Sequence, residues 1–580
     1  MVFGDCHTPF PAMLHGLNSP KGRLILIEAL VLLGTVLLFL LIIFGSFRRR
    51  SGNTVIQGVV WVAYTCSTYL VVYTVGLMQS SGVNNGLLAL WGICLSLVLG
   101  SAISISAYGL EDNENWKKNL VEHMIYIFII CGLVGTYVRL THSGFKVPVI
   151  VLSILTAARV GQRTDAFRMA TKTNGQKKSK LIADYKKYEP ELTPQDEPDP
   201  TNMRGYNYLV YGEDRVGRIC KAPDYLLRIE ITDHRVITVN KIWRCTGSLL
   251  NSSGDPEGRL KDICLSFALF KLIQRRFSGY QHAESSLQKT RDFVIRGLLS
   301  NDDDAHERAF RVIENKLGQF SLLEHCDYKP TAKNKLYNKT CEIVGKARAG
   351  QKQSKRLKLP REVKKAVVRW LKLNHDALPT NGISSLQRNG VIAQLSWACN
   401  LETHAQVILV WHIATSLCEI HGSRVERAKV TSMEMKDNQV VANSLSRYCA
   451  YLVGFVPDLL PDNGFVAQLI FDNAVKEASS LLGTFNLDQR FRSMMNLSDT
   501  SQTVVCRGAT LGKQLIDMET PEMRWKVMAE FWVEMILFLA PSDNAKAHAE
   551  GLARGGEFIT HLWALLSHAG ILGRGHSCIL

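Results

Sequence analysis

The stretch that decides the fold is Leu24–Phe44, LILIEALVLLGTVLLFLLIIF, which holds 21 residues and a single charged side chain, Glu28. A helix of about 20 apolar residues is as long as the hydrocarbon core of a bilayer is thick. Arg48, Arg49 and Arg50 follow this stretch directly. Because basic residues collect on the cytoplasmic side, we expect a membrane-spanning helix with the N-terminus outside or in a lumen. The apolar run is too long for a cleaved signal peptide.

Four further stretches extend this pattern. Residues 55–78 and 87–110 contain no charged side chain, and 120–140 has charges only near its ends. The fifth stretch, 145–160, is shorter. Without it, the basic run that begins at Arg159 would lie outside, against the positive-inside rule. We therefore predict a transmembrane bundle of five spans in residues 1–160, with the rest of the chain in the cytoplasm.

The third predicted span has small residues at regular spacing. Gly92, Ser96, Gly100 and Ser104 recur every four residues and so share one face of a helix. In lipid, faces of this kind allow two helices to approach closely. We interpret these residues as an intramembrane packing face within the bundle, with a dimer contact or a solute path as the alternatives.

The remainder of the chain has a different composition. The 580 residues carry a net charge of +16 and have a mean hydropathy of +0.01, an average over an apolar part and a polar part that divide near residue 160. Residues 161–204 have the charged, Pro-rich composition of a linker and favour an extended chain. Helical spacing of apolar residues then predicts a cytoplasmic helical domain over 205–460 and a helical C-terminal region over 461–580. The expected fold class is mainly α.

Individual elements follow from local patterns. The β-branched run 229–239 is typical of a strand. Apolar residues at helical spacing predict one helix after Asp255 and Pro256 and another through Phe310, Ile313, Leu317 and Phe320. The stripe of the first of these helices consists of Leu260, Ile263, Cys264, Phe267 and Phe270. Further helices are expected at 361–373, 384–420, 440–455, 465–482, 508–518, 521–540 and 556–569.

Three quarters of the net charge lies in one short block. Residues 333–372 contain 14 basic and two acidic side chains. After Pro360 this block predicts an amphipathic helix whose apolar face is opposite Arg361, Lys365, Arg369 and Lys372. A core helix with a solvated basic face is one interpretation. The sharper hypothesis is that the block binds anionic lipid of the inner leaflet, where each basic residue adds about 1 kcal/mol.

Patterns for metal or nucleotide chemistry are incomplete. The fourteen cysteines include no C-x-x-C pair, which favours free thiols in a reducing compartment. His412, Cys418 and His421 are the best local metal-ligand set, but no second pair at ligand spacing follows. The run 508–513 differs from a phosphate-binding loop because three residues, rather than four, separate its glycines and Gln514 follows Lys513. We therefore expect no metal and no cofactor.

Several segments resemble a known family. They are AYGLEDNENW (107–116), VNKIWRC (239–245), LSFALFK (265–271), AFRVIE (309–314), WHIAT (411–415), LSRY (445–448) and EGLARGGEFITHLW (550–563). Together they resemble a large plant family of membrane proteins, which pairs a domain of unknown function numbered 4220 with a C-terminal domain of unknown function numbered 594. The resemblance covers about 55–460 and 510–572. It implies a plant multi-pass membrane protein, and it transfers no catalytic residue.

These observations favour binding over catalysis. Our first hypothesis is a multi-pass membrane protein whose cytoplasmic helical domain serves as an interaction or scaffold module. Its expected partners are the lipid bilayer, anionic lipids and proteins that the sequence does not identify. Nucleic acid is not expected, because the chain shows no nucleic-acid module. A transporter or channel subunit is the second hypothesis, and a membrane-tethered enzyme with an unrecognised site is the third.

Overall fold

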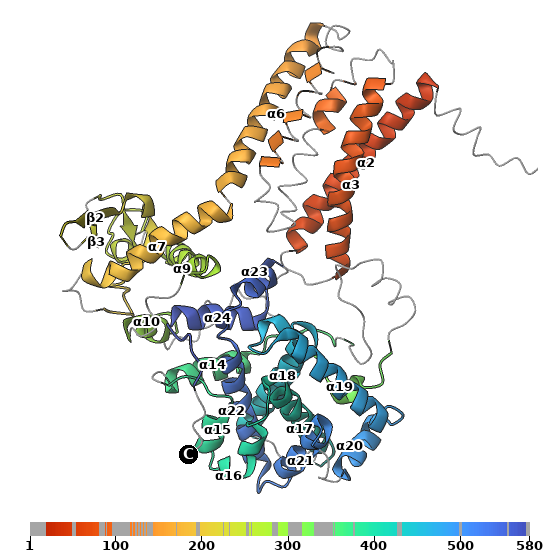
Figure 1. Cartoon of the computed structure of the whole chain (residues 1–580), viewed down its shortest axis with the longest axis vertical. Helices are drawn as coiled ribbons and strands as arrows, with labels where there is room; N and C mark the ends of the chain where they lie inside the picture. Colours follow the sequence, from red (N-terminus) through yellow and green to blue (C-terminus); the bar gives the residue numbers. More distant parts are fainter. Residues whose placement is uncertain are drawn as a thin grey trace, which may run out of the picture. The chain divides into compact units, whose positions relative to one another are not determined.

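The chain divides into two compact units, Met1–Lys178 and Ser179–Leu580, whose elements are labelled in Figure 1. The computed structural model describes most of the second unit and part of the first. The described residues are 19–48, 54–80, 143–169, 171–192, 198–223, 225–230, 233–250, 258–280, 288–299, 316–329, 354–374, 377–425, 432–497, 502–553 and 556–575, with single residues or short runs between them.

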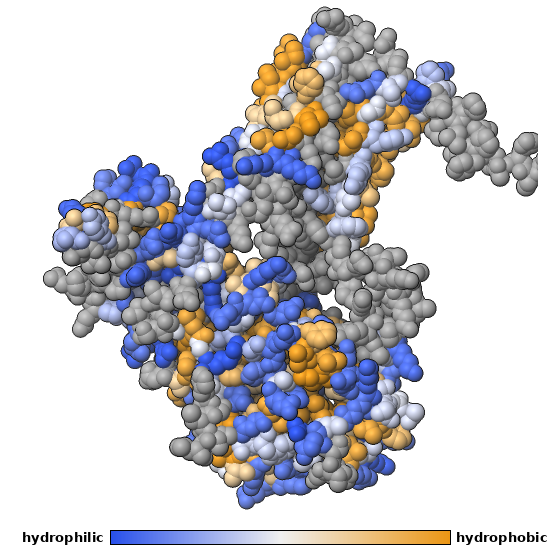
Figure 2. Space-filling model, viewed as in Figure 1, coloured by the Kyte–Doolittle hydropathy of each residue, from blue (hydrophilic) through white to orange (hydrophobic). Residues whose placement is uncertain are grey.

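Unit 1 contains long apolar helices. The helices α2 (Pro20–Arg48) and α3 (Thr54–Ser80) form an antiparallel pair, in which Ile27 packs near Val75 and Leu41 packs near Val60. Among the described residues these are the two helices long and apolar enough to cross a membrane. Only 17% of the most apolar part of α2 is buried, and 41% of that of α3. Hydrophobic side chains therefore cover the outside of these helices, as Figure 2 shows.

The other predicted spans are described unevenly. The fifth, 145–160, lies within α6 (Ser143–Met169), whose apolar residues Val147 and Ile154 are exposed. Most of 87–110 and 120–140 lies outside the described residues, so the number of spans stays a prediction. Gly92 is buried in a helical turn, whereas Ser96, Gly100 and Ser104 are not among the described residues.

The segment predicted to be an extended linker is helical as far as Leu192. The helix α6 continues to Met169, and α7 (Lys172–Leu192) begins three residues later. Lysine, alanine, leucine and glutamate in α7 all favour a helix. Tertiary packing adds to this preference, because Ile182 and Tyr185 are buried and the Tyr185 hydroxyl donates to the Asn207 carbonyl over 2.8 Å.

Unit 2 begins with short strands and the helix α9. Two antiparallel pairs form, β1 with β4 and β2 with β3, and a third joins β5 to β6. The bounds are β1 Leu209–Tyr211, β2 Gly217–Lys221, β3 Leu226–Glu230, β4 Ile237–Thr238, α8 Val239–Trp243, α9 Arg259–Phe277, α10 Gln288–Asp292, β5 Lys316–Leu317, α12 Leu322–His325 and β6 Leu357–Lys358. Short 3-10 and π turns lie at Glu213–Arg215 and Phe293–Leu298.

Three helices form the centre of unit 2. These are α17 (His404–Val425), α18 (Met433–Phe455) and α22 (Pro521–Leu539), drawn in the lower half of Figure 1. The helix α18 contacts both of the others, and Trp411 of α17 stacks on Phe531 of α22. Nearly every side chain from Val527 to Leu539 is buried, so α22 is a core helix and not a surface one. The surrounding helices are α14 Arg361–Leu373, α15 Ile383–Arg388, α16 Ile392–Leu395, α19 Gly464–Leu482, α20 Leu487–Met495, α21 Val504–Ile516, α23 Ala545–Ala553 and α24 Phe558–His568.

Three predicted elements differ from the structure. The helix expected over 384–420 is divided into α15, α16, a 3-10 turn and α17, because Gly390 adopts a φ of +71° that ends α15. The strand expected over 229–239 is interrupted between β3 and β4, and Thr238 caps α8 by accepting from the Lys241 amide. Leu317 belongs to β5, where it pairs with Leu357, and not to a helix.

Two glycines allow α21 to pack closely against α17. A Cβ atom on Gly508 would lie 2.7 Å from the side chain of Ile413, and one on Gly512 would lie 2.6 Å from that of Leu417. Both distances are shorter than carbon atoms tolerate. Gly508 and Gly512, whose spacing is close to that of a phosphate-binding loop, are therefore buried residues within α21. They set the distance between α21 and α17.

We predict that Gly508→Ala and Gly512→Ala each lower the free energy of unfolding of unit 2 by about 1–3 kcal/mol, because each methyl group overfills a tight contact. The higher helix propensity of alanine offsets less than about 1 kcal/mol of this loss. The measurement is denaturant unfolding in detergent solution, followed by tryptophan fluorescence. Gly551→Ala is the control, since its Cβ would meet only the Thr560 hydroxyl at 3.6 Å. Equal stability of all three variants would contradict the prediction.

Candidate functional site

The basic face predicted from the sequence lies on α14, whose bounds coincide with the predicted helix 361–373. The apolar side of α14 is buried against α18 and α22. Its buried residues are Val363, Val367, Val368, Trp370 and Leu371. On the other side Arg361, Lys365 and Arg369 are exposed and Lys372 is half-buried. The four residues therefore share the outer face of one helix, and whether that face binds a partner stays a prediction.

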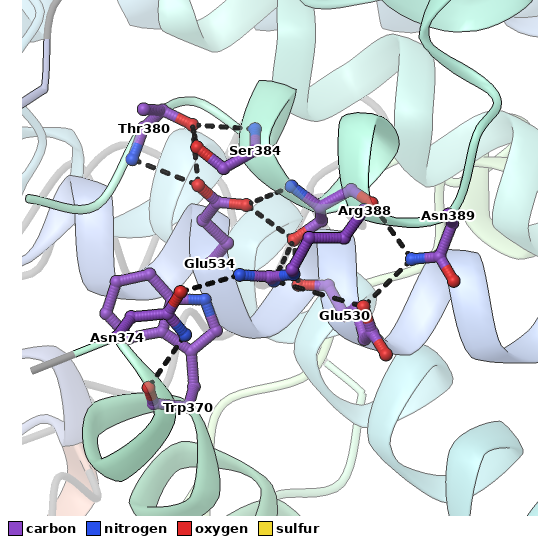
Figure 3. Close-up of polar contacts among 9 residues, drawn as sticks. Trp370, Asn374, Thr380, Ser384, Arg388, Asn389, Glu530 and Glu534 are labelled. Atoms are coloured by element: carbon purple, nitrogen blue, oxygen red, sulfur yellow. Dashed lines mark hydrogen bonds and ion pairs between the residues drawn. The ribbon is translucent and has the colours of Figure 1, made fainter. Parts of the chain in front are cut away.

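Hydrogen bonds at its C-terminal end fix the orientation of α14. The side-chain amide of Asn374 donates to the Trp370 carbonyl over 2.9 Å, and its oxygen accepts from the Arg388 guanidinium over 2.7 Å. Figure 3 shows that Arg388 joins α14 to α15 and α22. It also donates to the Ser385 hydroxyl over 3.1 Å and forms an ion pair with Glu530 at 3.9 Å.

The centre of this polar cluster is Glu534, a residue of α22 with 0% exposure. Its carboxylate accepts from the amide and hydroxyl of Thr380, over 3.1 and 2.5 Å, and from the amide of Ser385 over 2.7 Å. The Ser385 hydroxyl is a fourth donor. A buried carboxylate is tolerated only when donors surround it in this way. Glu534 thus holds the start of α15 against the core.

Sequence reasoning missed this cluster. The one signal for it in the sequence is the pair Glu530 and Glu534, which interrupts the otherwise apolar run 527–540. Its partners Thr380 and Ser385 lie about 150 positions earlier. No local pattern connects segments so distant in the sequence.

His412 uses both ring nitrogens in hydrogen bonds. Nε2 accepts from the Leu322 amide over 3.2 Å, so Nδ1 bears the proton and faces the Ser446 hydroxyl at 2.9 Å. Burial, together with the charge of Arg447, lowers the pKa of His412 to about 3. The imidazole is therefore neutral, and the lone pair of Nε2 is occupied by the hydrogen bond from the Leu322 amide. Within the described residues, no group of three or more His, Cys, Asp or Glu side chains could hold a metal.

A polar cleft of about 830 Å³ lies beside the start of α19. Three segments line it: 458–465, 541–544 and 572–575. Asp462 accepts from the Ala405 amide over 2.7 Å and pairs with His404 at 2.6 Å, so its carboxylate is occupied in capping α17. Arg574 donates to the Phe538 carbonyl over 3.2 Å. Asp462 and Arg574, two of the charged groups that line the cleft, thus serve structural contacts.

Comparison with known protein families identifies the domains of this chain. Two family models match the chain: "Domain of unknown function (DUF4220)" at residues 61–321 and "Protein of unknown function, DUF594" at residues 517–571. Their order and positions are those of the family suggested by the sequence motifs. The chain belongs to this family. No curated protein and no solved structure matches it. Both family descriptions state that the function is unknown, so membership assigns no activity and no ligand.

The DUF594 region packs directly on the DUF4220 region. Arg276 of α9 stacks over the indole of Trp563 in α24, with 4.5 Å between the guanidinium carbon and the ring centroid. It also donates to the Ser542 carbonyl over 2.9 Å, an acceptor that it shares with the Trp563 indole. Burial lowers the pKa of Arg276 to about 10. His548 stacks on the same indole at 4.5 Å.

A second contact joins the DUF594 region to the segment that precedes it. Glu557, which begins α24, accepts from the hydroxyls of Tyr448 and Tyr451 in α18 over 3.3 and 3.1 Å. The Tyr448 hydroxyl also accepts from the Ile559 amide over 3.0 Å. Burial and the nearby Glu557 carboxylate raise the pKa of both tyrosines. Both hydroxyls therefore stay protonated and act as donors.

We predict that Glu534→Gln lowers the free energy of unfolding of unit 2 by about 2–4 kcal/mol. The amide removes the negative charge and turns an NH₂ group toward hydrogen-bond donors. Denaturant unfolding with tryptophan fluorescence in detergent solution measures the loss. Glu530→Gln, one turn earlier on the same helix, is the matched control: its side chain is 34% exposed, and we expect a loss below about 1 kcal/mol. Equal losses in the two variants would refute the structural role of Glu534.

Proposed function

We propose that this protein is a multi-pass membrane protein in which unit 1 spans the bilayer with five helices and unit 2 is an interaction module on the cytoplasmic face. The observation that supports it most is the exposure of α2. Leu32 and Phe39 are 67% and 62% exposed in a helix of 29 residues. A helix that is apolar on all sides and not buried by protein requires lipid around it.

The length and exposure of α2 also argue against a signal peptide and against a soluble core helix. Its apolar stretch, Pro20–Gly45, is longer than the hydrophobic segment of a signal peptide, which has about 7–15 residues. A core helix of a soluble protein would be mostly buried, as α22 is. The antiparallel pairing of α2 with α3 agrees with two successive spans, and Arg48, Arg49 and Arg50 lie between their apolar stretches in the sequence.

The interaction role of unit 2 rests on the outer face of α14. Arg361, Lys365 and Arg369 project from a helix whose other side is fixed to the core. Such a row attracts an anionic surface, and the headgroup layer of anionic lipid is the simplest example. The polar clusters described inside unit 2 take part in structural hydrogen bonds. We therefore favour binding over catalysis for this unit.

Glycosylation in microsomes tests the topology. We predict that Asn251, Asn338 and the exposed Asn496, all within acceptor sequences, stay unmodified because unit 2 is cytoplasmic. Cys6→Asn completes an acceptor sequence with His7 and Thr8 ahead of the first span, and we expect this variant to be glycosylated. The double variant with Thr8→Ala is the control and should lose the modification. Glycosylation of unit 2, or none in the Cys6→Asn variant, would contradict the proposed topology.

Binding to anionic vesicles tests the role of α14. The full chain, held in neutral lipid nanodiscs, should bind vesicles that contain phosphatidylserine. A triple variant, Arg361→Gln, Lys365→Gln and Arg369→Gln, should bind at least about tenfold more weakly, since each basic residue contributes about 1 kcal/mol. The matched control removes three exposed charges elsewhere: Lys436→Gln, Arg492→Gln and Lys526→Gln. Equal weakening in the two triple variants would show that net charge, and not the face of α14, governs binding.

A further inference from the structure

The helix α9 presents an apolar face to the outside of unit 2. Ile263, Phe270, Phe267 and Leu260 are 63%, 55%, 48% and 41% exposed. They lie at the spacing of one helix face, and the rings of Phe267 and Phe270 stack with 6.4 Å between centroids. These residues are the stripe whose spacing predicts the helix, yet they face away from the core. A contiguous exposed apolar surface of this kind indicates a binding surface.

The opposite face of α9 is fixed, so the helix cannot turn its apolar stripe inward. Leu265, Ala268 and Leu272 are buried in the main core. The Lys271 ammonium donates to the Val210 carbonyl over 2.9 Å and to the Glu213 carboxylate over 2.7 Å. Arg276 is held by its contacts with Trp563 and Ser542 in the DUF594 region. Charged residues on the inner face therefore determine which side of α9 is left outside.

Basic residues lie next to the end of this helix. The Ser278 hydroxyl, directly after α9, donates to the Ser179 hydroxyl of α7 over 2.9 Å. The flanking residues Lys178 and Lys180 are exposed. An apolar face with two aromatic rings and neighbouring lysines has the composition of a helix that lies in the headgroup layer of a membrane. Aromatic rings and lysine side chains are both favoured at that depth.

The chain also keeps α7 close to the last apolar helix. Only Ala170 and Thr171 separate α6 from α7, and Ser179 is the first residue of unit 2. If residues 145–160 of α6 span the bilayer, as the proposed function requires, Ser179 follows the end of that span by 19 residues, so unit 2 is tethered to the membrane surface. A lipid surface is therefore always available to α9, whereas a protein partner would have to be recruited.

We propose that unit 2 rests on the bilayer through the apolar face of α9, with Ile263, Phe267 and Phe270 inserted among the headgroups and the adjacent lysines of α7 facing anionic lipid. This inference depends on the proposed membrane anchoring by unit 1. It gives unit 2 a fixed orientation relative to the membrane, because α9 is rigidly joined to the core.

Photo-crosslinking to lipid tests the proposal on the full chain. p-Benzoylphenylalanine replaces one phenylalanine at a time in protein held in nanodiscs of phosphatidylcholine and phosphatidylserine, and intact-protein mass spectrometry detects lipid adducts after illumination. Position 39 on α2 reports the anchor, and position 267 reports the face of α9. Position 465 is the matched control, because Phe465 is 75% exposed on a different helix of unit 2. All three native residues are exposed, so the substitutions leave the core intact.

We expect lipid adducts at positions 39 and 267, with a yield at 267 several-fold above that at 465. Adducts at 39 but not at 267 would overturn the role of α9 and leave the anchor standing. Equal yields at 267 and 465 would also overturn it, as would crosslinks from 267 to a second protein chain. Absence of adducts at 39 would refute the anchoring on which the inference rests.

Discussion

The carboxylate of Glu534 is buried in the core helix α22, and the arrangement around it depends on satisfying that charge. Four donors from Thr380 and Ser385 surround it, which fixes the turn before α15. The helix α15 then positions Arg388, and Arg388 holds Asn374 at the end of α14. Through α15, one buried charge in α22 therefore adds a polar contact to the apolar packing that orients α14. Replacing such a charge costs more than its pairwise contacts suggest, because its donors are left unpaired in an apolar core.

The same logic explains why the DUF594 region is not a peripheral addition. It supplies α22, the helix at the centre of unit 2, and α24, whose Glu557 accepts from two tyrosines of α18. Through Trp563 it also holds Arg276 of α9 in the DUF4220 region. The packing of α23 and α24 on α9 joins the two regions within unit 2. The DUF594 region also connects the two exposed faces, since α9 and α14 are both held against its elements.

Local patterns predicted much of this fold, and their failures have a common cause. The bounds of α14, its buried face and its row of basic residues follow from spacing alone, because amphipathicity is a local property. The spacing of Ile263, Phe267 and Phe270 likewise gives a helix. It does not reveal that Lys271 and Arg276 find partners far away in the sequence and so take the inner side. For the same reason, local patterns did not predict the contacts of Glu534 or the Gly508–Ile413 contact. Each depends on residues about 100 or more positions distant.

The polar groups described above support the proposal that unit 2 is an interaction module. Catalytic sites place titratable groups where a substrate reaches them and shift their pKa toward the working pH. The buried titratable groups of unit 2 described above lie in the core, and their pKa values are shifted away from the working pH. His412 has a pKa lowered to about 3 by burial, which keeps it neutral, and Tyr448 is held protonated beside Glu557. Their hydrogen bonds join helices and leave no proton to exchange with a substrate. The part of unit 2 that the structure describes has an apolar face on α9 and a basic face on α14, and the two proposals rest on these faces.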